Sequence, residues 1–101
     1  MKYTQLPNNY KYQHIANAIY AREVEYFHYD FDRINFEHLV ANLPPSAFRD
    51  DIENRISETK EQMNKVKAII FALNSQIDDE TAYAEAVSYV TKQREKEEAA
   101  K

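Results

Sequence analysis

The chain has 101 residues, enough for one domain, and its 13 basic residues are scattered among 17 acidic ones to give a net charge of −4, so a basic footprint for nucleic acid is missing. It contains no cysteine, which excludes disulfides, thiolate metal sites and thiol nucleophiles. It also contains no glycine, which argues against the phosphate-binding loops of nucleotide enzymes, because those loops need backbone conformations that glycine adopts most readily.

Residues 1–11 are expected to form an N-terminal arm, because Leu6-Pro7-Asn8-Asn9 combines a proline with turn-forming asparagines. The arm has no apolar run of the signal-peptide type. Nor does any stretch of the chain approach the ~20 apolar residues that a membrane span needs. A cytoplasmic location is therefore expected.

Two long helices are expected over residues 12–43 and 46–77, separated by a pair of prolines. Leu43 precedes Pro44, and a proline disfavours helical backbone geometry at the residue before it. Ser46 is suited to cap the second helix, because its hydroxyl can accept a hydrogen bond from a free amide of the first turn. The short connection predicts that the two helices fold back as an antiparallel hairpin.

The second expected helix carries a heptad seam, in which residues follow alternating steps of four and three. Charged and amide residues flank the seam, as they do in coiled coils. The pattern predicts that one face of this helix packs along the first helix. The seam consists of Ile52, Ile56, Thr59, Met63, Val66, Ile70, Leu73 and Ile77.

A shorter third helix is expected over residues 79–97, beginning at the acidic cap sequence Asp78-Asp79-Glu80-Thr81. Its apolar side is thin, and its charged, alanine-rich tail should fray because it has little to bury. The predicted fold class is all-α: a long antiparallel helical hairpin with coiled-coil-like packing, plus a shorter third helix, in a single domain of residues 1–101.

The first expected helix carries two apolar stripes, which lie more than about 90° apart when successive residues are placed ~100° around the axis. A single neighbouring helix usually matches an apolar arc of only ~100°, so at least two neighbours are expected. The phenylalanine stripe consists of Tyr20, Val24, Phe27, Phe31, Ile34, His38 and Ala41. The tyrosine stripe consists of Ile15, Ile19, Arg22, Tyr26, Tyr29, Arg33, Phe36, Val40 and Leu43.

We expect the phenylalanine stripe to pack against the second helix and the tyrosine stripe to meet a neighbouring subunit. The third helix is too short and too weakly apolar to cover a face ~45 Å long. Aromatic side chains are also enriched at protein interfaces. The alternative is an intrachain three-helix bundle, since tyrosines tolerate partial exposure. The expected interface residues are Ile15, Ile19, Tyr26, Tyr29, Phe36 and Val40.

Glu23, Asp30 and Glu37 form an acidic row that recurs every seven residues between the two stripes. Such a row could hold a metal ion or a basic ligand. Charged residues beside a helix seam more often pair with the neighbouring helix, and we favour that interpretation. The expected partners on the second helix are Arg49, Arg55, Lys60 and Lys67.

Glu25 and His28 form a Glu-x-x-His segment, with Asp32 one turn further along the same face. This spacing resembles the ligand motif of ferritin-like di-iron proteins, and encapsulated ferritins are similarly short helical hairpins that complete their metal sites across a dimer. The resemblance implies iron ligation by this face. The face of Glu25, His28 and Asp32 is, however, the most polar side of the helix. Its position favours a solvated array of charges without a metal. The second helix offers three further glutamates, Glu53, Glu58 and Glu61.

His38 lies within an apolar stripe, where a lone histidine is more often a hydrogen-bonded core or interface residue than a catalyst. No serine, threonine or lysine accompanies it in a nucleophile arrangement. No catalytic residue, cofactor or metal is therefore predicted.

The predicted function is a non-enzymatic helical assembly or adaptor protein that acts through protein–protein contacts, as a homo-oligomer or as a subunit of a larger complex. A compact helical chain without glycine or cysteine would suit an accessory protein of a phage or mobile element. Neither direct nucleic-acid binding nor membrane binding is expected. One alternative is a ferritin-like metal-binding hairpin. The other is an acidic inhibitor of a nucleic-acid-binding protein, which would present Asp30, Asp32, Asp50, Asp51, Asp78, Asp79 and Glu80.

Overall fold

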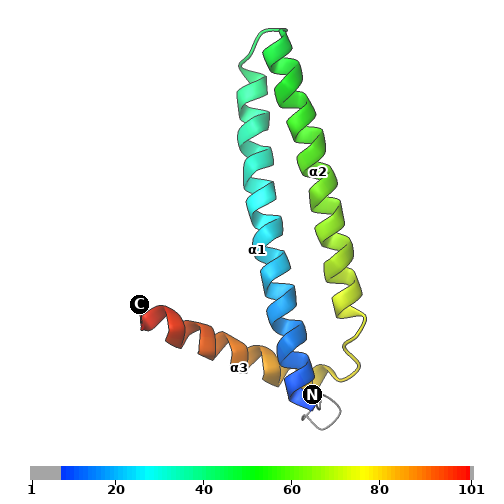
Figure 1. The fold of residues 1–101 in the computed structure, drawn as a ribbon, viewed down its shortest axis with the longest axis vertical. Coiled ribbons are helices and arrows are strands. Elements are labelled where there is room, and N and C mark those ends of the chain that lie inside the picture. Colours follow the sequence, from blue (N-terminus) through cyan, green and yellow to red (C-terminus); the bar gives the residue numbers. More distant parts are fainter. Residues whose placement is uncertain (1–7, 101) are drawn as a thin grey trace, which may run out of the picture. The chain divides into compact units, whose positions relative to one another are not determined.

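The computed structural model describes residues 8–100, and all regular structure in that range is α-helical. The helices are α1 (Asn8–Ala41), α2 (Ala47–Asn74) and α3 (Glu80–Ala99), as labelled in Figure 1. The predicted fold class is confirmed: α1 and α2 form a helical hairpin, and α3 is a third helix. Within residues 8–100, no helix has the length and apolar character required to cross a membrane.

The ends of the helices differ from the predicted bounds by a few residues. α1 begins at Asn8, so the last part of the expected arm is helical, while residues 1–7 of that arm lie outside the described residues. At its other end α1 stops at Ala41, and the Asn42 side chain donates a 3.0 Å hydrogen bond to the His38 carbonyl.

Side chains cap the next two helices at the positions that the sequence predicts. The Arg49 amide donates to the Ser46 hydroxyl over 3.1 Å at the start of α2. The Ala82 amide donates to the Asp79 carboxylate over 3.1 Å at the start of α3. Each cap satisfies one of the amides that a helix leaves without an intrahelical partner.

Contacts within the chain divide it into two compact units. We call Met1–Ala21 with Phe71–Lys101 the terminal unit, and Arg22–Ile70 the hairpin unit. The first therefore contains the start of α1, the end of α2 and all of α3, whereas the second contains the turn between α1 and α2 with the helix lengths on either side of it (Figure 1).

The terminal unit has its own hydrophobic core, in which α3 packs against the start of α1. The Tyr12 and Tyr83 rings meet edge to face, with centroids 6.4 Å apart. Ala86, on the facing side of α3, is the most buried of the core residues at 1% exposure, so the two helices approach closely there. The core consists of Tyr12, Ile15, Ile19 and Ala86, with Leu73, Ile77, Ala82 and Tyr83 packed around it.

Polar contacts also join the start of α1 to α3 and to the segment that precedes it. The Tyr12 hydroxyl donates a hydrogen bond to Asp78, which raises the pKa of Tyr12 and lowers the pKa of the Asp78 carboxyl. Arg94 of α3 donates to the Asn17 side chain over 3.1 Å. Its guanidinium carbon also lies 3.5 Å from the centroid of the Tyr20 ring, a cation–π contact with α1.

In the hairpin unit, the heptad seam is the covered face of α2. Ile52, Met63 and Val66 are buried, and Ile56 and Ile70 are half-buried. The prediction that this seam is the packing face of α2 is therefore confirmed for the hairpin unit. The pattern identified the covered face because α2 has only one apolar stripe of this length.

Candidate protein-interaction surface

The phenylalanine stripe of α1 faces solvent in the hairpin unit. Phe27 and Phe31 are 67% and 57% exposed, although both are large apolar side chains. Val24 and Ile34, on the same stripe, are 38% and 40% exposed. The prediction that this stripe packs against α2 is therefore wrong.

The tyrosine stripe is the side of α1 that the hairpin unit covers. Tyr26, Tyr29, Phe36 and Val40 are all half-buried. The Lys67 ammonium of α2 lies 5.9 Å from the centroid of the Tyr26 ring, which places this stripe beside α2. The stripe that the hairpin unit covers and the stripe that it leaves exposed are thus the reverse of those expected.

Ile15 and Ile19, the two residues of the expected interface outside the hairpin unit, lie in the core of the terminal unit. Each is 6% exposed and packs in the same cluster as Ala86 of α3. These two side chains are therefore inaccessible to another protein in this conformation. All six residues of the expected interface are therefore buried or half-buried within the chain itself.

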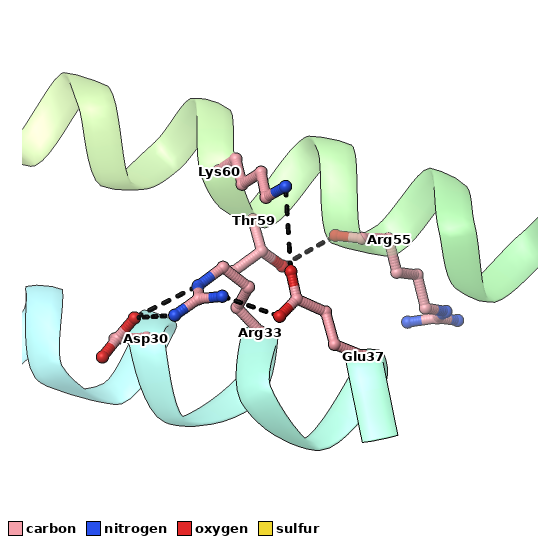
Figure 2. Close-up of polar contacts among 6 residues, drawn as sticks. All are labelled: Asp30, Arg33, Glu37, Arg55, Thr59 and Lys60. Carbon is pink, nitrogen blue, oxygen red and sulfur yellow. Dashed lines mark hydrogen bonds and ion pairs between the residues drawn. The ribbon is translucent and has the colours of Figure 1, made fainter. Parts of the chain in front are cut away.

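An ion-pair network explains how the tyrosine stripe can face α2 although it contains an arginine (Figure 2). Arg33 donates to Asp30 over 2.7 and 3.1 Å and to Glu37 over 2.8 Å. The two hydrogen-bonded carboxylates raise the pKa of Arg33. On α2, the Lys60 ammonium lies 3.7 Å from the other oxygen of Glu37.

Two of the three residues in the acidic row are therefore paired within the chain. Lys60 is one of the expected partners of the row, whereas Arg33, on α1 itself, is not among them. The sequence does contain the necessary signal, because Asp30 and Glu37 stand three residues before and four after Arg33, the spacings at which helix side chains meet. An arginine flanked in this way can lay its stem along a covered face and keep its charge satisfied.

An open groove runs beside the phenylalanine stripe, between α1 and α2 in the hairpin unit. Its volume is about 400 Å³. Phe27 and Ile70 supply apolar walls, while Glu23 and Asp30 supply carboxylates. The groove extends the exposed apolar surface of α1 toward the next helix. The lining residues are Glu23, Tyr26, Phe27, Asp30, Lys67 and Ile70.

The residues of the ferritin-like motif are engaged in ordinary surface contacts. Arg22 forms a 3.0 Å ion pair with Glu25, and the His28 ring meets the Phe27 ring edge to face, with centroids 6.3 Å apart. Across residues 8–100, no three histidine, aspartate or glutamate side chains converge closely enough to hold a metal ion. The ligand set that the resemblance implies is thus not assembled within the described part of one chain.

Comparison with known proteins provides no family and no relative from which a function could be transferred. No family model matches the sequence, and searches of the curated proteins and of the solved structures give no match. The function has to be argued from the exposed surface itself.

Proposed function

We propose that this protein is a non-enzymatic helical adaptor or assembly protein that binds other protein surfaces through the phenylalanine stripe of α1. The proposal is carried by the exposure of Phe27 and Phe31, which stand one helical turn apart and leave more than half of their surfaces in water. Soluble chains bury phenylalanine more often than most residues, and contiguous exposed apolar side chains mark interaction sites.

The magnitude of the exposed surface supports an interface of several residues. At roughly 200 Å² per aromatic side chain and ~25 cal/mol per Å², covering the exposed parts of Phe27 and Phe31 contributes roughly 6 kcal/mol. Association costs an estimated 4 kcal/mol or more in lost translational and rotational freedom. The two phenylalanines alone thus barely offset the cost, so Val24 and Ile34 have to take part as well.

Photo-crosslinking tests the proposal whichever protein is bound. Replacing Phe31 with p-benzoylphenylalanine should give protein–protein adducts on irradiation in the cells that express the chain. The matched control carries the same amino acid at Phe48, which is 55% exposed on α2 but lies outside the stripe. Equal adduct yields from the two positions would contradict the proposal.

Salt dependence separates this function from the acidic-inhibitor alternative. Apolar contacts are not screened by salt, whereas surface charges lose their reach beyond ~8 Å at physiological ionic strength. Raising the salt from low to moderate concentration should therefore change affinity only slightly. A tenfold or larger loss would favour the acidic inhibitor.

A further inference from the structure

We infer that the phenylalanine stripe is a second heptad seam, and that it is covered by the same stripe of a second copy of this chain in parallel orientation. The inference rests on the proposed function, because it names the protein that occupies the proposed surface. Three observations carry it: the spacing of the stripe, the side chains that flank it, and the way in which its acidic flank is already neutralised.

The stripe repeats with the heptad spacing from Val24 to Ala41, over ~26 Å of helix. Helices with this spacing pack by inserting the residues of one seam between those of another. A second copy presents the same spacing, and a two-fold contact lets each exposed residue be covered by the same patch of the other chain. The a positions are Val24, Phe31 and His38, and the d positions are Phe27, Ile34 and Ala41.

The flanks of the stripe differ in chemistry. The acidic row of Glu23, Asp30 and Glu37 occupies the g positions on one side. Within α1, the e positions on the other side hold His28 and Asn35, whose side chains can donate hydrogen bonds.

These flanks select a parallel pair. In parallel packing, each g residue faces an e residue of the other chain, so Glu23 meets His28 and Asp30 meets Asn35. In antiparallel packing, g faces g, so carboxylates would face carboxylates and no donor would lie opposite them. Charges at e and g positions are known to set the orientation of paired helices in this way.

The acidic row is also poorly suited to a strongly basic binding protein. Asp30 and Glu37 already bond Arg33, and Glu37 is shared with Lys60. Within the described part of the chain, only Glu23 of the row is without an ion pair. A neutral row of donors, which a second copy provides, therefore fits this flank better than a row of lysines.

The size of the contact indicates a reversible dimer. The exposed parts of Phe27 and Phe31 amount to roughly 250 Å² per chain at ~200 Å² per side chain, or roughly 500 Å² in a symmetric pair. Even with the neighbouring residues, this stays near or below the ~1,200 Å² at which stable interfaces begin. The dimer should thus dissociate on dilution.

Cross-linking of single-cysteine variants tests the pairing, because the natural chain contains no cysteine. A disulfide requires two Cα atoms within about 4.4–6.8 Å, so Ala41→Cys can bond its own counterpart only where the two helix ends are adjacent. We expect oxidised Ala41→Cys to form a disulfide-linked dimer, and added Phe27→Glu to prevent it. Ala68→Cys, on an exposed position of α2 away from the heptad seam, should stay monomeric under the same conditions.

Charge variants at Asn35 test the orientation independently. In the parallel pair, Asn35→Lys faces Asp30 of the second copy and should leave the affinity close to that of the wild type, because Asp30 already bonds Arg33. Asn35→Glu places an unpaired carboxylate against Asp30 and should weaken the dimer roughly two- to tenfold. Light scattering over a dilution series measures both. The reverse order of affinities would overturn the parallel arrangement, as would a dimer in which Ala41→Cys fails to cross-link.

Two experimental results distinguish a failure of the dimer from a failure of the proposed adaptor function. A wild-type chain that stays monomeric at high concentration, while benzoylphenylalanine at position 31 still captures another protein, overturns the second copy as occupant and leaves the adaptor function standing. A monomeric chain with no selective capture at position 31 overturns both.

Discussion

The Tyr12 hydroxyl near the start of α1 donates a hydrogen bond to the Asp78 carboxylate in the segment that precedes α3. The bond holds the pKa of Asp78 below its ordinary value and the pKa of Tyr12 above its own. An aspartate in the unfolded chain has a pKa of about 3.9. The stabilisation from Asp78 is therefore complete above roughly pH 5, and it is lost as the pH falls through the lowered pKa of the folded state. A tyrosine in the unfolded chain has a pKa of about 10. The stabilisation from Tyr12 is therefore complete below that pH, and it is lost as the pH rises through the raised pKa of the folded state.

Tyr12→Phe should therefore lower the thermal midpoint most between roughly pH 5 and pH 9, and the difference from wild type should shrink on both sides of that window. Circular dichroism melts across the pH range measure it. Tyr89→Phe, at a half-exposed tyrosine of α3, is the matched control and should follow the wild type throughout. A deficit that stays constant from acid to alkali would contradict the assignment.

The reversal of the two stripes can be checked with a pair of alanine substitutions. Met63→Ala removes a buried side chain from the heptad seam and should lower the free energy of unfolding by about 2 kcal/mol or more. Phe31→Ala removes a larger side chain from the exposed stripe and should change the stability of the monomer by less than about 0.5 kcal/mol. Urea titrations below the dimerisation concentration provide both values. If Phe31→Ala proved the more destabilising, the stripe would have to be a covered face.

The close approach of α3 to α1 is tested by enlarging one alanine. Ala86 is 1% exposed, so Ala86→Leu should overpack the core of the terminal unit and cost about 1–3 kcal/mol. Ala84→Leu places the same side chain on the exposed side of α3 and should be nearly neutral. Thermal melts of the two variants are the measurement, and equal stabilities would show that α3 does not pack through Ala86.

The charge network around Arg33 should depend on salt. Arg33→Gln leaves Asp30 and Glu37 without their common partner, so it should lower the thermal midpoint at low ionic strength. In 1 M salt, where screening acts within ~3 Å, the difference from wild type should become much smaller. Arg55→Gln removes an arginine of α2 that has no ion pair among the described residues and should show little effect at either salt concentration. A salt-independent deficit for Arg33→Gln would assign its role to packing alone.

The parts of the fold that the sequence predicted depend on local signals. Ser46 and Asp79 cap helices through bonds to residues three positions away, and the heptad seam leaves α2 only one apolar face of its length. The rotation of α1 was not predictable by the same rules. Its two stripes are both apolar, and the choice between them depends on contacts with α2, such as the one between Glu37 and Lys60.

The candidate surface escapes prediction for the same reason. Hydrophobic burial alone favours the more apolar stripe for the interior and leaves the stripe that contains Arg33 for an interface. Because Asp30 and Glu37 satisfy that arginine locally, the tyrosine stripe can lie against α2 without leaving a charge unpaired. Phe27 and Phe31 then remain outside.

The two units also differ in how far apart along the chain their contacts are made. Arg22–Ile70 is one continuous segment with the turn within it, whereas the terminal unit joins two segments from opposite ends of the sequence. Its bonds from Tyr12 to Asp78 and from Asn17 to Arg94 span 66 and 77 positions. Since the entropy of loop closure grows with loop length, the hairpin unit should form first and shorten the loop that the terminal unit must close. During synthesis, the apolar side chains of Ile15 and Ile19 consequently stay exposed to water until α3 has left the ribosome and can pack against them.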